Sequence, residues 1–275
     1  MMSAAQALFA GRLPRLVMFD LDGTLVDSVP DLAAAVDKAL IGMGRAPAGL
    51  EQVRHWVGNG ARVLVRRALA GGIEHEGVSE EDTERALALF MDAYADSHAL
   101  TEVYPGVVDT LKWLKKQGVE LALITNKPER FVAPLLDEMG LGKFFRWIVG
   151  GDTLPQQKPD PAALLFVMKA AGVAPGEALF VGDSRNDVLA AKAAGVRSVG
   201  LTYGYNHGRP IAEEQPSLVL DDLRQLLPCF DPGKAIVLPD DGSNPAHRDS
   251  NVLDTAPRKL WMKVIKALAR WRWRA

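Results

Sequence analysis

Cysteine and histidine are scarce in this chain of 275 residues, which has one cysteine, Cys229, and five histidines. A single cysteine excludes an internal disulfide and a cysteine-based zinc site. The histidines show no spacing that is typical of metal ligands. With 48% hydrophobic and 24% charged residues, the chain has enough apolar side chains to bury a core in one large domain or two smaller ones.

Long apolar runs and an excess of basic charge are also absent. The sequence has no uncharged apolar stretch of about 18 residues, so we expect no membrane-spanning helix. Residues 1–16 lack the charged start and apolar run of a signal peptide, which favours a cytoplasmic protein. The formal net charge of −2 argues against nucleic acid as a partner.

Short apolar runs alternate with amphipathic segments along most of the chain. The runs predict buried parallel strands at 16–19, 119–124, 147–149, 178–181 and 196–201. The segments between them predict helices at 107–117, 129–139, 161–171 and 186–194, each followed by a glycine. This alternation predicts an α/β fold, a doubly wound parallel sheet with helices on both faces.

Residues 28–100 break this alternation, because they show helical periodicity and no convincing strand. The clearest predicted helices cover 31–43, 60–70 and 79–98. A helical block placed after the first strand predicts a second, smaller domain, with hinges near 26–29 and 99–104. The α/β core would then comprise residues 1–27 and 101–228.

The C-terminal part has a different composition. Residues 229–257 are rich in Asp, Pro, Gly, Ser and Asn and predict a flexible linker. Residues 258–274 contain seven basic residues, three tryptophans and no acidic residue. As a helix, this basic tail (258–275) would be amphipathic, which suits an anionic membrane surface or a partner groove. The alternative is a tail that packs on its own core or frays in solvent.

Polar residues follow four of the predicted structural elements, at the sheet edge where parallel folds bind ligands. Asp20 and Asp22 leave the first strand, beside Gly23, whose backbone freedom permits close approach to an anion. Thr125 and Asn126 follow a later strand and offer a hydroxyl and an amide. Taken alone, each pattern is also compatible with a turn or a loop start.

Two further groups complete the set. Lys158 precedes a proline-rich helix start, with Asp160 as the expected cap. Asp183 and Asp187 follow the strand at 178–181. A solvated lysine and a helix N-terminal cap are the ordinary interpretations of these residues. Together with the first two groups, however, they favour one functional site at the ends of the strands.

In this order, the four groups resemble the motifs of the haloacid dehalogenase superfamily over about residues 14–227. The helical block resembles the helical cap domain of that family. Dehalogenase members lack the second aspartate, so the presence of Asp22 favours phosphoryl transfer over dehalogenation. The resemblance implies a phosphatase with Mg²⁺ as cofactor and a small phosphate ester as its partner.

The chemistry of phosphate esters suggests a role for each residue. A phosphomonoester is a dianion, and Mg²⁺ would screen it from an attacking carboxylate. Asp20 would be the nucleophile that forms an aspartyl-phosphate, and Asp22 the proton donor and then the base. Lys158 would neutralise charge on the transferred group. The hydroxyl and amide of Thr125 and Asn126 would hold the remaining oxygens.

The expected metal ligands are carboxylates and one carbonyl. We expect Asp20 and Asp183 to bind Mg²⁺ through their side chains. The backbone carbonyl of Asp22 is the third ligand that the resemblance implies. Asp187 would support the site either as a direct Mg²⁺ ligand or through contacts with the residues that bind the metal.

Substrate choice is expected to depend on the helical block. Its segment with Gly58, Asn59 and Gly60 resembles bacterial phosphoglycolate phosphatases within the superfamily, which implies 2-phosphoglycolate as substrate and glycolate and phosphate as products. A plain turn between helices is the alternative for this segment. One of the arginines at 62, 66 and 67 would be available for the substrate carboxylate, although three arginines on one helix are also typical of a solvated face.

Other functions stay open at this point. Within the superfamily, the chain would also fit a broader sugar-phosphate phosphatase or a phosphosugar mutase. A non-enzymatic binding module is the alternative from another class. The intact set of Asp20, Asp22, Lys158, Asp183 and Asp187 argues against that alternative.

Overall fold

The centre of the protein is a parallel sheet of six strands, seen here in a computed structural model that describes residues 9, 12–95 and 99–230. The strands lie in the order β5-β4-β1-β6-β7-β8. Their bounds are Leu16–Phe19 (β1), Glu120–Ile124 (β4), Trp147–Val149 (β5), Ala178–Gly182 (β6), Arg197–Leu201 (β7) and Leu218–Leu220 (β8). This confirms the predicted α/β fold.

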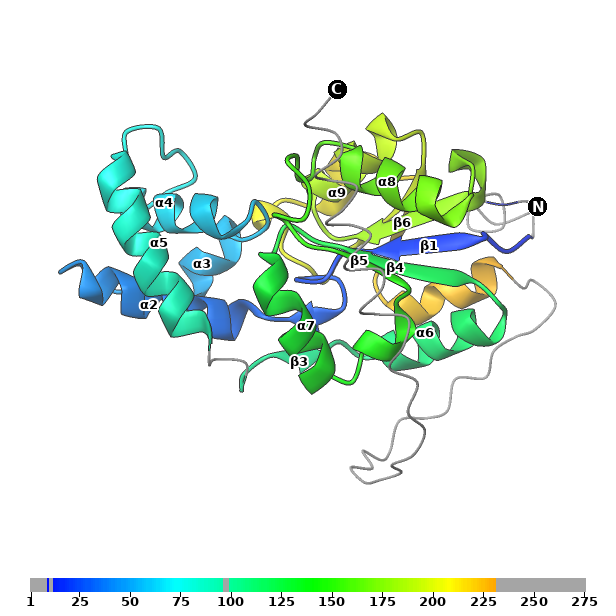
Figure 1. Cartoon of the computed structure of the whole chain (residues 1–275), viewed down its shortest axis with the longest axis horizontal. Coiled ribbons are helices and arrows are strands. Elements are labelled where there is room, and N and C mark those ends of the chain that lie inside the picture. The colour runs from blue at the N-terminus through cyan, green and yellow to red at the C-terminus, as the bar shows by residue number, and fades with distance from the viewer. Residues whose placement is uncertain (1–8, 10–11, 96–98, 231–275) are drawn as a thin grey trace, which may run out of the picture.

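Helices cover both faces of the sheet, as Figure 1 shows. Because side chains alternate along a strand, Val17 and Phe19 of β1 enter one apolar core, and Leu16 and Met18 enter the other. The first core is closed by α6 (Val107–Lys116) and α7 (Glu129–Glu138). The second is closed by α8 (Ala162–Ala171) and α9 (Arg185–Ala193).

The strand order reverses around β1. From β1 the chain forms β4 and β5 on one side, and then returns to form β6, β7 and β8 on the other. Phe19, the last residue of β1, is in register with Leu123 of β4 and Val181 of β6. The loops after these three strands therefore start at the same edge, which is where open α/β sheets bind ligands.

A separate group of helices follows β1 and lies beyond this edge, at the left of Figure 1. Its members are α2 (Val29–Gly42), α3 (Leu50–Trp56), α4 (Ala61–Ala70) and α5 (Glu80–Ala95). They share an apolar cluster built around Val36, Trp56 and Phe90, which Phe131 of α7 and Tyr205 also join. The chain enters and leaves this group through the antiparallel pair β2 (Val26–Asp27) and β3 (Glu102–Val103). We refer to α2–α5 as the cap.

Helix α3, strand β8 and the two-residue strands β2 and β3 were not predicted. Helix α3 has only seven residues, which is too short for helical periodicity to stand out. Strand β8 has three residues at the sheet edge, and Val219 in its middle is exposed. Five short 3-10 turns complete the described chain, η1 (Gly142–Phe144), η2 (Pro175–Glu177), η3 (Asn206–Gly208), η4 (Ile211–Glu214) and η5 (Leu223–Cys229).

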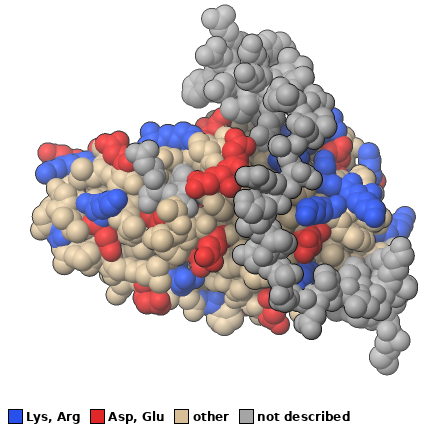
Figure 2. Space-filling model, turned by 90° about the horizontal axis from the view of Figure 1, so that it is seen from below, with Lys and Arg blue, Asp and Glu red and all other residues tan. Residues whose placement is uncertain are grey.

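The surface shows charges of both signs. Across the described part of the face in Figure 2, basic and acidic side chains lie near one another, in keeping with the small net charge. In the part of the chain that the structure describes, no helix combines the length and the apolar character that crossing a membrane requires. The predicted basic tail at 258–275 and nearly all of the predicted linker lie outside the described residues.

Candidate active site

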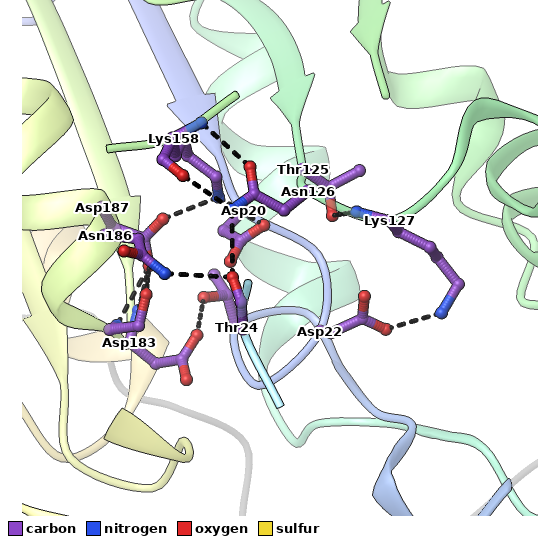
Figure 3. A network of polar contacts seen from close by, with 12 residues as sticks. Asp20, Asp22, Thr24, Thr125, Asn126, Lys127, Lys158, Asp183, Asn186 and Asp187 are labelled. Carbon is purple, nitrogen blue, oxygen red and sulfur yellow. Dashed lines mark hydrogen bonds and ion pairs between the residues drawn. The ribbon is translucent and has the colours of Figure 1, made fainter. Parts of the chain in front are cut away.

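Lys158 joins two carboxylates at the centre of the site. Its Nζ atom lies 2.7 Å from Asp20 Oδ1 and 2.7 Å from Asp187 Oδ1, as Figure 3 shows. Only 3% of Lys158 is exposed, and 8% of Asp20. The two carboxylates raise the pKa of Lys158 to about 12, against the effect of its burial. The lysine is therefore a permanent positive charge beside Asp20.

Asp183 and Asp187 are fixed by hydrogen bonds from different elements. Asp183 Oδ1 accepts from the Thr24 hydroxyl at 2.8 Å, and its Oδ2 accepts from the Tyr205 backbone N–H at 2.8 Å. Asp187 Oδ2 accepts from the N–H groups of Asp183 and Ser184 and from the Ser184 hydroxyl. Asp187 therefore has partners on both carboxylate oxygens, because its Oδ1 accepts from Lys158 Nζ.

The three aspartates form a compact acidic cluster. Carboxylate oxygens of Asp20, Asp183 and Asp187 lie within 4.8 Å of one another, and all three residues are buried. Burial, partly offset by Lys158, raises the pKa of Asp20 from 3.8 to about 7, and burial together with its acidic neighbours raises that of Asp183 well above its usual range. Such a cluster gains stability from a divalent cation.

Asp22 points away from this cluster, toward the cap. Its Oδ1 accepts from the Ser28 hydroxyl at 2.5 Å and from Lys127 Nζ at 3.0 Å. Asp20 and Asp22 both line a small cavity of about 50 Å³, together with Thr125 and residues of the cap. The two carboxylates thus face one space from different sides, which is the arrangement that a nucleophile and a proton donor require.

Thr125 and Asn126 have different surroundings. The Thr125 hydroxyl oxygen accepts from the Lys127 N–H at 3.1 Å, which leaves its own O–H able to donate into the cavity. Asn126 donates both amide hydrogens to the carbonyls of Gly58 and Lys158, and its Oδ1 accepts from the Lys158 N–H. The Asn126 side chain therefore fixes the Lys158 backbone and holds the cap, whereas we expected it to hold phosphate oxygens.

The cap segment at Gly58 is attached to the core by amide side chains. Its carbonyl accepts at 3.0 Å from Asn126 and at 3.0 Å from Asn186. The amide of Asn59 approaches Asn186 Oδ1 at 3.4 Å. Gly60 has a φ of 82° and packs so closely that a Cβ there would lie 3.2 Å from the Asn126 carbonyl oxygen. The three residues thus form one of the contacts between cap and core, and Gly58 and Gly60 also line the cavity.

The arginines of α4 do not face the cavity. Arg62 pairs with Glu80 and Glu84 on α5. Arg66 pairs with Glu80, and Arg67 donates to the Trp56 carbonyl at 2.7 Å. The solvated face expected as the alternative fits Arg62, which pairs with exposed glutamates, but not Arg67, which is buried between α3 and α4.

Comparison with known proteins identifies the family. Residues 14–195 match the model of the haloacid dehalogenase-like hydrolases. The chain belongs to this family. It is 78% identical to phosphoglycolate phosphatase 1 of Pseudomonas aeruginosa and 73% identical to phosphoglycolate phosphatase of Pseudomonas putida, in both cases over the full length of both chains.

Solved structures of this family show the same fold. A protein from Haemophilus somnus, described as a predicted phosphoglycolate phosphatase, is 40% identical with a TM-score of 0.73. The alignment covers 78% of this chain and 96% of that one. A putative phosphoglycolate phosphatase from Lactobacillus delbrueckii is 26% identical with a TM-score of 0.74, and 81% of this chain and all of that one are covered.

The donor set of this family member fits Mg²⁺, a hard cation that prefers oxygen ligands. Within the described residues, Asp20 Oδ1 accepts no well-aligned hydrogen bond, and its contact with Lys158 is an ion pair. Gly23, with a φ of 85°, leaves room for the Asp183 carboxylate, which a Cβ there would overlap. Asp20 and Asp183 therefore retain free lone pairs, whereas Asp187 is engaged by four donors and suits a supporting position.

Several residues of the site were missed from the sequence. Lys127 directly follows Thr125 and Asn126, and this position beside two predicted site residues is the sequence signal that could have identified it. Tyr94, Ser28 and Asn186 come from helices or hinge segments whose contacts with the site depend on how the cap meets the core. No local pattern reports such long-range contacts.

The attachment of the cap gives a first prediction. In Asn186→Ala the Gly58 carbonyl loses one of its two amide donors, so closure of the cap should be weaker. We expect kcat/KM to fall about 3- to 10-fold, mainly through KM, at a cost of about 1 kcal/mol in the free energy of unfolding. Steady-state kinetics and urea unfolding measure the two effects. Unchanged kinetic constants would show that this contact does not affect closure.

The acidic cluster gives a second prediction, for the metal-free protein. Because the pKa of Asp20 is raised from 3.8 to about 7, its carboxyl group holds a proton through most of this range, and a cation must displace it. Because the pKa of Asp20 is higher in the folded protein, folding favours the protonated carboxyl, and this group stabilises the metal-free fold most at low pH. The stabilisation decreases as pH rises through about 7. We expect Mg²⁺ affinity to rise up to about tenfold per pH unit below pH 7. Calorimetric titrations at about pH 5.5 and about pH 7.5 would contradict this if they gave equal affinities.

Proposed function

We propose that this chain is a Mg²⁺-dependent phosphatase that hydrolyses 2-phosphoglycolate to glycolate and phosphate. The observation that carries the chemistry is the placement of Asp20 and Asp22 on one small cavity, with Lys158 paired to the first. The substrate is supported by the full-length relatives in two Pseudomonas species that are named phosphoglycolate phosphatases.

Binding of the phosphate group uses charges that are already in place. Lys158 lies beside Asp20 and offsets the repulsion between that carboxylate and a phosphate dianion. The Thr125 hydroxyl donates to a phosphate oxygen from the end of β4. Mg²⁺ held by Asp20, Asp183 and the Asp22 carbonyl would supply further positive charge to the phosphate oxygens. Asp187 keeps Lys158 and the loop after β6 in position.

The reaction then has two displacements at phosphorus. A carboxylate oxygen of Asp20 forms a bond to phosphorus, and the bond to the glycolate oxygen breaks as Asp22 gives that oxygen a proton. In the second step, Asp22 takes a proton from a water molecule. The water oxygen bonds to phosphorus, and the Asp20 carboxylate is released. The proton on Asp22 is thus restored and both products leave.

The organisation of the chain is proposed to serve this cycle. We assign residues 1–27 and 101–228 to the catalytic core and 28–100 to the cap, which opens at the β2–β3 hinge and closes over the substrate. Closure excludes water before the aspartyl-phosphate forms. The cytoplasmic location expected from the sequence stays a prediction.

The lining of the cavity favours a small ester. Leu32, Phe90 and Phe131 bound it, and their apolar side chains offer no hydrogen-bond partners to the hydroxyl groups of a sugar ring. A broader sugar-phosphate phosphatase and a mutase are therefore less well supported than a phosphoglycolate phosphatase.

A substrate panel tests the proposal. We expect kcat/KM for 2-phosphoglycolate to exceed that for glucose 6-phosphate, ribose 5-phosphate and a nucleoside monophosphate by about 100-fold or more. EDTA should abolish phosphate release in every case, and added Mg²⁺ should restore it. A higher kcat/KM for any sugar phosphate or nucleotide would refute the substrate assignment.

A further inference from the structure

Lys127 is a buried positive charge that the reaction outlined above does not use. It follows β4, and its side chain is 3% exposed. Its Nζ atom lies 3.0 Å from Asp22 Oδ1 in the core and 2.6 Å from the Tyr94 hydroxyl on α5 of the cap. Figure 3 shows that Lys127 approaches Asp22 from the side opposite to Lys158.

The ammonium group of Lys127 is charged and has a donor to spare. Burial acts to lower its pKa, but Asp22 and Tyr94 outweigh this and keep the pKa above its ordinary value. A lysine ammonium group has three N–H donors. Among the described residues, Asp22 and Tyr94 accept two of them. The third is available to a molecule in the cavity that Lys127 lines.

No other cationic side chain of the described chain lines this cavity. Lys158 is engaged by two carboxylates. The arginines of α4 are held by glutamates of α5 or by the Trp56 carbonyl. Much of the cavity wall is apolar, with Leu32, Phe90 and Phe131, so a second negative charge on a ligand would be costly there without a cationic partner.

The geometry of the proposed substrate matches this arrangement. In 2-phosphoglycolate the carboxylate carbon is two bonds from the ester oxygen that Asp22 protonates. A group that binds the carboxylate must therefore lie next to Asp22, on the side away from the phosphate. Lys127 is in that position, since its Nζ contacts Asp22 and lies opposite Lys158.

We propose that Lys127 is the specificity-determining residue that binds the carboxylate of the substrate. This inference rests on the proposed function. Because Lys127 also contacts Tyr94, the carboxylate is bound where cap and core meet. The same ammonium group holds Asp22 beside the ester oxygen, so recognition of the carboxylate and protonation of the leaving group occur at adjacent atoms.

The test compares two esters that differ only in the charge to be recognised, namely 2-phosphoglycolate and its amide, phosphoglycolamide. The readout is the ratio of their kcat/KM values. In Lys127→Met we expect this ratio to fall about 10- to 100-fold, because a charge-assisted hydrogen bond to the carboxylate is lost. The absolute rates on both esters should also fall, because Asp22 loses a partner. Loss of the carboxylate contact lowers the ratio, whereas misplacement of Asp22 lowers both rates and leaves the ratio unchanged.

Controls keep the result interpretable. Lys115→Met removes an exposed lysine of α6 and should leave the ratio unchanged. If Lys127→Met does not fold, as judged by circular dichroism, Lys127→Gln replaces it, since an amide still donates to Asp22 but carries no charge. An equal loss on both esters, with the ratio preserved, would show that Lys127 only positions Asp22 and would overturn the inference.

Failure of the proposed function would look different. It would appear in the wild-type protein, as a preference for a sugar phosphate in the substrate panel or as equal kcat/KM for phosphoglycolate and its amide. Failure of the Lys127 inference would appear only in the variant, as a preserved ratio in a protein whose wild type discriminates.

Discussion

Asp20→Asn is expected to lower the rate of phosphate release from 2-phosphoglycolate by at least about 10⁴-fold. The amide has nearly the shape of the carboxylate but is neutral and cannot form the aspartyl-phosphate. It also replaces one ligand of the acidic cluster with Asp183 and Asp187, so Mg²⁺ affinity should fall as well. Single-turnover assays with saturating Mg²⁺ distinguish the chemical effect from the effect on metal binding.

The matched control is Asp92→Asn, which removes an exposed carboxylate from α5 far from the acidic cluster. It should retain wild-type kinetics. Circular dichroism and thermal unfolding of Asp20→Asn should show a folded protein, because the substitution relieves repulsion among buried carboxylates even as it weakens the pair with Lys158. Appreciable phosphate release by folded Asp20→Asn would mean that another group attacks phosphorus.

Lys158→Met should have the largest effect on stability. It removes the cation from between Asp20 and Asp187 and leaves buried carboxylates unpaired. Loss of one partner from a buried ion pair is expected to cost about 3–5 kcal/mol in the free energy of unfolding of the metal-free protein. Activity should fall about 10²- to 10³-fold, because the charge beside the transferred phosphate is lost.

Mg²⁺ provides a second readout for this variant. Urea unfolding with EDTA and with Mg²⁺ should show a larger stabilisation by the metal in Lys158→Met than in the wild type, since the cation then offsets more unpaired charge. Lys38→Met, which changes an exposed lysine on α2, controls for the loss of positive charge and should behave as the wild type. Equal stability of Lys158→Met and wild type without metal would contradict the described ion pairs.

The sequence was informative where a polar residue directly follows a buried strand. Asp20 and Asp183 come at the ends of strands that are buried and apolar, so their meeting at one sheet edge could be inferred from the parallel fold. For these two aspartates a local pattern determines where the side chain goes. Lys158 is different, because Asn126, 32 residues away in the chain, holds its backbone N–H and carbonyl.

Contacts between distant segments were not accessible in this way. Asn126 was expected to hold phosphate oxygens, yet its amide bonds to Gly58 of the cap and to Lys158, which only the assembled fold brings near. Lys127 looks like an ordinary surface lysine in the sequence and is almost fully buried in the structure. Its Nζ atom donates to the hydroxyl of Tyr94, a cap residue 33 positions away in the chain.

The central claim is that Asp20 receives the phosphoryl group of 2-phosphoglycolate. The most direct measurement is a rapid-quench reaction with excess enzyme, followed by borohydride reduction and peptide mass spectrometry. An aspartyl-phosphate is reduced to homoserine, so the account predicts homoserine at position 20 and nowhere else. Homoserine at another aspartate, or none at all while phosphate is being released, would contradict it.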